Sequence, residues 1–193
     1  MKSWLRSINI FLLAAAAVFA GGCSTHHLSM NKDYATLSIY FEGRPLDSLP
    51  VQVGWNKTTM YREANPVLTE DDLSMAKLVD KADGSYEIQL TFTDHGKTVL
   101  DMQTIGKQGR HLVILANLRP KGWKEPEGGD SASEETPQPG QPRRIFWLAA
   151  PLIPPNGISN GFLRFAPEVS HAEAEKIVLG WNNMAKELHK GEG

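Results

Sequence analysis

The sequence predicts an α+β domain with a single, mostly antiparallel sheet and two main helices packed on one face of it. Alternating or continuous apolar segments of strand length recur between residues 34 and 165. Long stretches of helical apolar periodicity follow only Thr93 and Ser170. The 193-residue chain is long enough for one domain with its own hydrophobic core.

The chain begins with a segment typical of bacterial export signals. Lys2 and Arg6 precede an apolar run over residues 8–19, and small residues at 20–22 lead to Cys23, the only cysteine. This arrangement resembles a lipoprotein signal, in which residues 1–22 are removed and Cys23 receives acyl chains, palmitate among them. Two alternatives are an ordinary secretory signal with a chance cysteine and an uncleaved membrane anchor, for which the run is short.

The residues around the cysteine predict a lipid-anchored protein of the cell envelope. Ser24, not Asp, follows Cys23, which by analogy with Gram-negative sorting favours the outer membrane, with the domain facing the periplasm. Residues 23–33 are polar and aperiodic, which is typical of a flexible tether. With Cys23 lipidated, no thiol remains for a disulfide, a nucleophile or a thiolate metal site.

Charge and hydropathy exclude two further classes of protein. Removal of the two basic residues in 1–22 changes the formal net charge from −2 to −4, which gives no reason to expect a nucleic-acid partner. No second apolar stretch approaches the roughly 20 residues of a membrane helix. The main domain is expected over residues 34–190.

The first part of this domain predicts three strands and a short helix. Residues 34–41 alternate and end in a turn signal, and residues 51–55 and 59–63 are two further short strands. Thr69 followed by three acidic residues is typical of a capped helix start, with Leu73 facing inward.

A strand and a helix follow. Residues 86–92 alternate between apolar and polar, which predicts a half-buried strand. Thr93 is the expected N-cap of the next helix, whose inward face is assigned to Val99, Leu100 and Ile105.

The C-terminal part predicts three strands and the longest helix. Residues 112–116 and 145–150 are apolar runs expected to pair centrally, and 161–165 form a last short strand. Ser170 and Glu173 have capping-box spacing. Apolar residues then recur at helical spacing: Ala174, Ile177, Val178, Trp181, Met184, Ala185 and Leu188.

Residues 119–144 differ in composition from the rest of the domain. They contain five prolines and four glycines but no Val, Ile, Leu or Met. Such a segment cannot bury enough apolar area to offset the entropy lost on ordering, so it is predicted to be a disordered insertion between two strands.

Five segments, taken in order, resemble the head of the first periplasmic domain of SecD, a subunit of the SecDF protein-export complex. These segments are 66–73, 86–96, 109–114, 150–153 and 170–174. The resemblance covers roughly residues 50–188 and implies a SecD head-like fold in a stand-alone lipoprotein. SecD carries membrane helices, and this chain has none with an intramembrane carboxylate for proton transport. The resemblance therefore implies a domain and not an export motor. The family's head domain contacts emerging polypeptide, but that role does not transfer to this chain residue by residue.

The titratable residues give little support to an enzyme or a metal site. No HExxH, GxSxG, P-loop or GxGxxG pattern occurs. His26 and His27 lie in the tether, where two ligands without a scaffold make a poor metal site. A hydrolase would need a pocket that joins His95 or His111 to a carboxylate and a serine. No cofactor, metal or catalytic residue is predicted.

Tryptophans are the best candidate partner contacts. Trp147 and Trp181 are assigned to the core, whereas Trp123 in the insertion and Trp55 at a strand end are expected to be exposed. Exposed tryptophans are favoured anchors for a partner. We predict a non-catalytic, lipid-anchored protein that binds a protein or peptide partner, with strand addition at an exposed sheet edge as one mechanism. The alternative is a permanent accessory subunit of an envelope complex.

Overall fold

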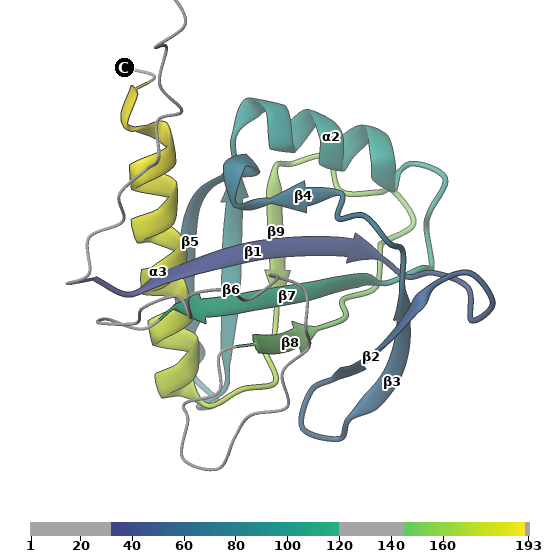
Figure 1. The fold of residues 1–193 in the computed structure, drawn as a ribbon, viewed down its shortest axis with the longest axis horizontal. Coiled ribbons are helices and arrows are strands. Elements are labelled where there is room, and N and C mark those ends of the chain that lie inside the picture. Colours follow the sequence, from purple (N-terminus) through teal and green to yellow (C-terminus); the bar gives the residue numbers. More distant parts are fainter. Residues whose placement is uncertain (1–31, 120–144, 192–193) are drawn as a thin grey trace, which may run out of the picture.

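The computed structural model describes residues 32–119 and 145–191. Figure 1 shows the strands flanked by two helices. In chain order the elements are β1 (Tyr34–Phe41), β2 (Leu49–Val53), β3 (Thr58–Arg62), β4 (Leu68–Thr69), the 3-10 turn η1 (Glu70–Asp72), β5 (Leu73–Asp80), β6 (Tyr86–Phe92), α2 (Asp94–Thr104), β7 (Leu112–Arg119), β8 (Ile145–Ala149), β9 (Phe162–Phe165), α3 (His171–Leu188) and the 3-10 turn η2 (His189–Gly191).

The strands form three antiparallel sheets. The largest has the order β4-β1-β7-β8, a second has the order β5-β6-β9, and β2 and β3 form a hairpin. The predicted α+β class is confirmed, but the prediction of one sheet is corrected to several. A sheet must bury its apolar face against another layer. Two sheets that face each other bury both apolar faces at once.

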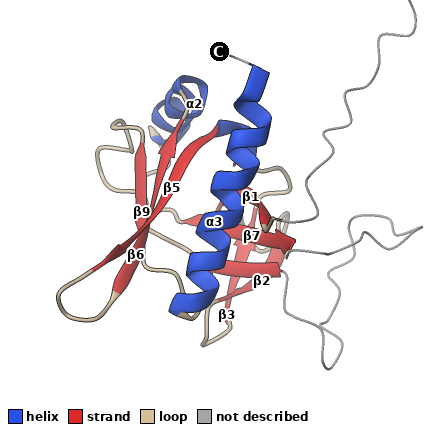
Figure 2. Cartoon of the chain, turned by 90° about the vertical axis from the view of Figure 1, so that its left-hand side faces the viewer, coloured by secondary structure: helices blue, strands red, loops and turns tan. Residues whose placement is uncertain are grey.

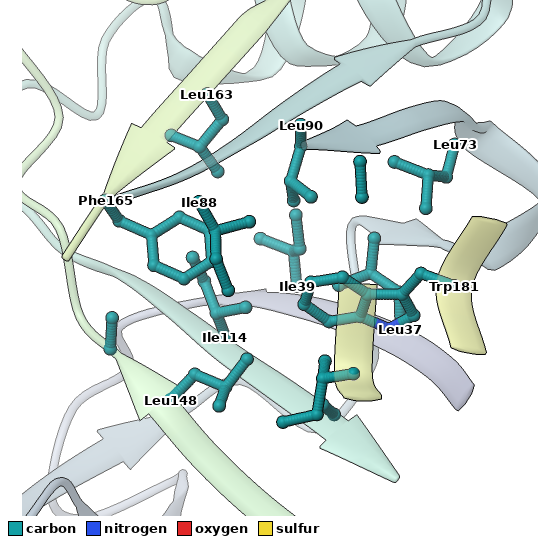
Figure 3. Close-up of a cluster of buried hydrophobic side chains, with 14 of the residues drawn as sticks. Leu37, Ile39, Leu73, Ile88, Leu90, Ile114, Leu148, Leu163, Phe165 and Trp181 are labelled. Atoms are coloured by element: carbon teal, nitrogen blue, oxygen red, sulfur yellow. The ribbon is translucent and has the colours of Figure 1, made fainter. Parts of the chain in front are cut away.

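The four-stranded and three-stranded sheets face each other across the main core. Figure 3 shows Leu37, Ile39, Ile114 and Leu148 of one sheet opposite Ile88, Leu90, Leu163 and Phe165 of the other. All of these side chains are buried. The core therefore lies between the sheets and not under one of them.

Helix α3 closes one side of this core. Figure 2 shows α3 lying between β5 of one sheet and β1 and β7 of the other. Trp181 is fully buried, and its indole Nε1 donates to the carbonyl oxygen of Thr36 at 3.0 Å. A Cβ on Gly180 would lie 2.8 Å from the Ala35 nitrogen, so glycine permits the close approach of α3 to β1. Helix α3 therefore packs against strands of two sheets and not on the face of a single sheet.

The hairpin covers the outer face of the four-stranded sheet. A small cluster of Tyr40, Val51, Val53 and Val113 lies between them, with Trp147 partly buried beside it. The Arg62 guanidinium lies 4.3 Å from the centre of the Tyr40 ring. The three-stranded sheet differs, because Met75 and Phe162 on its outer face are exposed.

The short helix predicted after Thr69 is wrong beyond its first turn. Asp72 accepts a hydrogen bond from the Thr69 N–H at 3.0 Å, but the chain then enters β5. A β-bulge between Leu73 and Met75 shifts the register against β6 and leaves both Leu73 and Ala76 buried. The spacing of three between these two residues imitates a helical repeat.

The other local predictions are closer to the structure. Thr93 caps α2 by accepting from the Gly96 N–H, and Ser170 and Glu173 form the predicted capping box of α3. Leu100 is buried, but Ile105 is 63% exposed because α2 ends at Thr104. Residues 120–144 of the predicted insertion lie outside the described residues, whereas Arg119 ends β7.

Candidate functional site

Histidine–carboxylate pairs are the first place to look for catalysis. His95 Nδ1 lies 2.7 Å from Asp72 Oδ1 beside a cavity of about 650 Å³. No serine or cysteine lines this cavity, and the two threonines that do, Thr69 and Thr93, serve as caps of η1 and α2. The pair therefore has no free nucleophile among the described residues that line its cavity.

The second pair, His111 with Glu42, joins β1 to the start of β7. Glu42 Oε2 accepts from the His111 main-chain N–H at 3.0 Å and lies 2.7 Å from His111 Nδ1. Partial burial raises the pKa of Glu42, but these hydrogen bonds outweigh it, so the pKa lies below its ordinary value. Both hydrogen bonds of the Glu42 carboxylate are with His111, so they stabilise the link between the end of β1 and the start of β7.

Neither a metal-binding cluster nor a helix that could cross a membrane occurs in the described part of the chain. Within residues 32–119 and 145–191, no three His, Cys, Asp or Glu side chains are grouped to hold a metal ion. In the same ranges, no helix has the length and apolarity needed to cross a membrane.

The free edge of β9 is the feature that most resembles a binding site. The Phe92 N–H donates to the Gly161 oxygen at 3.2 Å, which sets the alternation of the β6–β9 ladder. The main-chain groups of Leu163 and Phe165 therefore face β6, and those of Phe162 and Arg164 point away from the sheet. The Phe162 N–H donates to Asn160 Oδ1 at 3.1 Å. No described residue forms a hydrogen bond with the main-chain N–H or oxygen of Arg164.

A groove of about 660 Å³ lies along this edge. Phe162, Arg164 and Gln89 line it on the side of the sheet, and the loop over residues 151–160 lines it on the other side. Most of the loop wall is apolar, with Leu152 57% exposed. An apolar groove beside unpaired main-chain groups is the combination that binds extended peptides in other proteins.

The loop wall of the groove is held in place by main-chain hydrogen bonds. The Leu112 N–H donates to the Pro151 oxygen at 2.9 Å, and the Ile153 N–H donates to the Arg110 oxygen at 2.8 Å. Further along, the Ile158 N–H donates to the hydroxyl of buried Thr104 at 2.9 Å. The groove is therefore formed before any partner binds, which lowers the entropic cost of binding.

The opposite edge of the three-stranded sheet is blocked by α3. Asn182 Oδ1 accepts from the Ala76 N–H at 2.8 Å, and Asn182 Nδ2 donates to the Ala76 oxygen at 2.9 Å. The amide side chain thus makes both hydrogen bonds that a neighbouring strand would make. His189 Nε2 contacts the Leu73 oxygen at 3.1 Å.

Two edges of the four-stranded sheet are covered in similar ways. On β1, beyond the short β4, Glu70 Oε2 accepts from the Leu37 N–H at 3.2 Å. Burial raises the pKa of the Glu70 carboxyl above its ordinary value. On β8, the Gly54 and Glu168 N–H groups donate to the oxygens of Trp147 and Leu148.

The residues predicted as sites are only partly visible here. Cys23, the predicted lipidation site, and Trp123, a predicted partner contact, lie outside the described residues. Trp55 lies in the β2–β3 turn with 64% of its surface exposed, and its N–H donates to Glu168 Oε2 at 3.0 Å. It does not line the β9 groove, so the structure does not bring it together with that edge.

Sequence reasoning named strand addition as a mechanism but located no edge for it. Leu152 lies in the SecD-like segment 150–153 but has no predicted binding role, and Arg164 belongs to no motif. The alternation of exposed Phe162 and Arg164 with buried Leu163 and Phe165 shows only that 162–165 is a strand. Whether a strand is an edge depends on pairing across the sheet, which local sequence does not reveal.

Comparison with known proteins finds similarity only at the level of structure. The sequence matches no family model and no curated protein. A solved structure of SecDF, described as a membrane component that enhances protein export, is similar over 84% of this chain and 70% of its own, with a TM-score of 0.50 and 18% identity. The domain has a SecD-like fold. At 18% identity the likeness establishes the fold alone.

Two longer SecDF structures are also similar. The super-membrane-facing form matches 77% of this chain with a TM-score of 0.49 and 18% identity, and SecDF from Thermus thermophilus, a translocon-associated membrane protein, matches 81% with a TM-score of 0.43 and 19% identity. This chain spans only about a fifth of those chains, 19% and 20% respectively. The similarity with a TM-score of 0.50 confirms the resemblance seen in the sequence motifs at the level of the fold, and the stand-alone lipoprotein stays a prediction.

Proposed function

We propose that this chain is a non-catalytic envelope protein whose SecD-like domain binds an extended segment of a partner protein along β9. One observation carries the proposal: the outward main-chain groups of Arg164 lie beside an apolar groove that is already formed. Strand addition satisfies such groups with the partner's main chain, while the groove accepts its side chains.

The process that we propose is linked to protein export. The similar SecDF structure is of a component that enhances export, and a domain that binds extended polypeptide suits that process. This step is an analogy of fold and supports the proposal without replacing a test.

We further propose that lipid on Cys23 anchors the protein, with the outer membrane as the expected site and the domain facing the periplasm. The support is the basic start, apolar run and small residues before the cysteine. Intact-mass analysis of the membrane-extracted protein should give a chain that begins at Cys23 with added acyl mass. Cys23→Ala should abolish that mass, and an unlipidated wild type would refute the anchor.

Trp55 and Trp123 are proposed as additional partner contacts. The large exposed fraction of Trp55 supports a contact away from β9, at the turn of the hairpin. A partner that occupies both surfaces at once would be bound more permanently, as an accessory subunit of a complex would be.

Hydrogen exchange followed by mass spectrometry tests the β9 site in the mature protein in detergent. The probe is a nine-residue peptide that alternates threonine with valine, with threonine at both ends and at the centre, and carries acetyl and amide ends. Added peptide should slow exchange in fragments that contain residues 162–165. Protection confined to β5, or no protection anywhere, would contradict strand addition at β9.

A matched pair of variants separates the groove from general surface effects. Leu152→Ser removes an apolar side chain from the groove wall and should weaken peptide binding severalfold. Leu179→Ser on α3 alters a residue of similar exposure, 52% against 57%, that does not line the groove. Equal weakening in both variants would show that the groove is not the site.

A further inference from the structure

The β9 groove carries a single charged side chain, that of Arg164. The remaining residues that line it are apolar, glycine or uncharged polar, and none is Asp or Glu. The cross-strand neighbours of Arg164 on the outer face are Gln89 and then Lys77, so the row contains two cations and no anion. The positive charge of the groove is therefore not compensated within the described residues that form it.

The guanidinium of Arg164 is held in one orientation. Its Nε donates to Gln89 Oε1 at 2.8 Å, which fixes the plane of the group across the β6–β9 ladder. That bond uses one of the five N–H donors of arginine. No described residue accepts from the two terminal nitrogens, which can form a two-pronged pair with a carboxylate.

Strand geometry places one residue of an added segment beside this guanidinium. Because the main-chain groups of Arg164 face the free edge, an antiparallel segment would pair with them directly. Directly paired residues point to the same face of a sheet, with their Cβ atoms about 5 Å apart. The two flanking residues of the segment point to the opposite face, the side of apolar Leu163.

We infer that the β9 groove selects extended segments that present a carboxylate to Arg164 between two apolar residues. This inference rests on the proposed function, because it presupposes strand addition at β9. The carboxylate has two possible sources with the same chemistry: an internal Asp or Glu, or the C-terminus of the bound segment.

Three peptides distinguish these sources. All derive from the uncharged valine–threonine peptide described above: one has Gln at the centre, one has Glu at the centre, and one has the Gln centre with a free C-terminal carboxylate. Dissociation constants are measured at low salt by fluorescence anisotropy with the mature protein in detergent. The Glu peptide should bind about three- to tenfold more tightly than the Gln peptide, and added salt should narrow the difference.

Arg164→Gln should bind the Gln and Glu peptides equally while retaining most of the affinity for the Gln peptide. The substitution suits an edge strand and leaves the β6–β9 ladder unchanged. Lys77→Gln, in the same row but on β5, is the matched control and should preserve the preference. Arg164→Lys keeps the charge without the two-pronged geometry and should retain only part of the preference.

The outcomes separate the inference from the function on which it rests. If no peptide binds, strand addition itself fails. If all three bind with equal affinity, or if the preference survives in Arg164→Gln, strand addition stands and the selection of a carboxylate by Arg164 is wrong. A preference for the free C-terminus over the internal Glu would support the inference and assign the carboxylate to a chain end.

Discussion

The two edges of the three-stranded sheet differ in how their outward main-chain groups are satisfied. At β5, the Asn182 side chain of α3 pairs with both the N–H and the oxygen of Ala76. At β9, the outward N–H and oxygen of Arg164 have no partner among the described residues, and a groove lies beside them. Asn182 thus closes the β5 edge at Ala76, whereas the β9 edge at Arg164 is available to a second chain.

This difference shows that the chain covers some of its sheet edges with its own groups and leaves the β9 edge open beside a groove. Unpaired edges promote aggregation, and natural proteins usually block them. Here a side chain also covers β1, where Glu70 accepts from Leu37, and main-chain groups of residues 54 and 168 cover β8. An edge left open beside a formed groove fits a binding role better than a failure of protection.

Trp181→Ala should have the largest effect on the comparison. The buried indole holds α3 between the sheets, and its loss should lower the free energy of unfolding by about 3–5 kcal/mol. Looser α3 packing should then expose the β5 edge to hydrogen exchange. Urea denaturation measures the change in the free energy of unfolding. Leu179→Ala, at an exposed position of the same helix, should change stability by less than about 0.5 kcal/mol.

Asn182→Ala tests the blocked edge directly. It leaves the N–H and oxygen of buried Ala76 without their partners, which should cost about 2 kcal/mol of stability. The opened edge should also pair with other chains, so sedimentation velocity should reveal self-association that grows with concentration. Asn183→Ala removes a bond to the Asp33 oxygen instead and should leave the protein monodisperse. Equal self-association of both variants would show that Asn182 does not block pairing at the β5 edge.

Glu70→Gln should have the smallest effect of these substitutions on the free energy of unfolding. It tests how the carboxyl group covers the edge of β1. Burial raises the pKa of Glu70 above its ordinary value of 4.5, so the folded protein holds this proton more tightly than the unfolded chain does. Protonated Glu70 therefore stabilises the folded wild type relative to the unfolded chain. This contribution to the free energy of unfolding is lost as the pH rises from 4.5 through the raised pKa. Gln keeps an oxygen for the Leu37 N–H but carries no charge.

The stability of Glu70→Gln relative to the wild type should consequently be higher at pH 7 than at pH 4. Parallel urea titrations at the two pH values measure this difference. A relative stability that is constant, or that is greater at pH 4, would mean that the carboxylate is not penalised by burial. In that case Glu70 would cap β1 at no electrostatic cost.

Several features of the fold were accessible from the sequence because they depend on neighbouring residues. The capping box of Ser170 and Glu173 and the N-cap Thr93 operate within one helical turn. The alternation in 86–92 likewise predicts one buried face without knowledge of a partner strand. The five sequence segments that resemble SecD, taken with their order and spacing, were enough to indicate a SecD-like fold.

The candidate site was not accessible in the same way. Leu73 and Ala76 have a spacing that is typical of a helix, but both lie in strand β5. The bulge that leaves both of them buried is seen only in the pairing of β5 with β6. The groove requires the 151–160 loop, fixed by contacts with residues 104–112, to lie beside β9.

The capped helices and the half-buried strand over 86–92 follow from the sequence alone, because each depends on residues a few positions apart. The lipoprotein-like leader stays a prediction of the sequence. The separate sheets, the closure of β5 at Ala76 and the open edge of β9 at Arg164 depend on the tertiary structure. The physical reason is separation along the chain: Asn182 satisfies Ala76 from 106 residues away. The edge at Arg164 is open because no described residue reaches it in space.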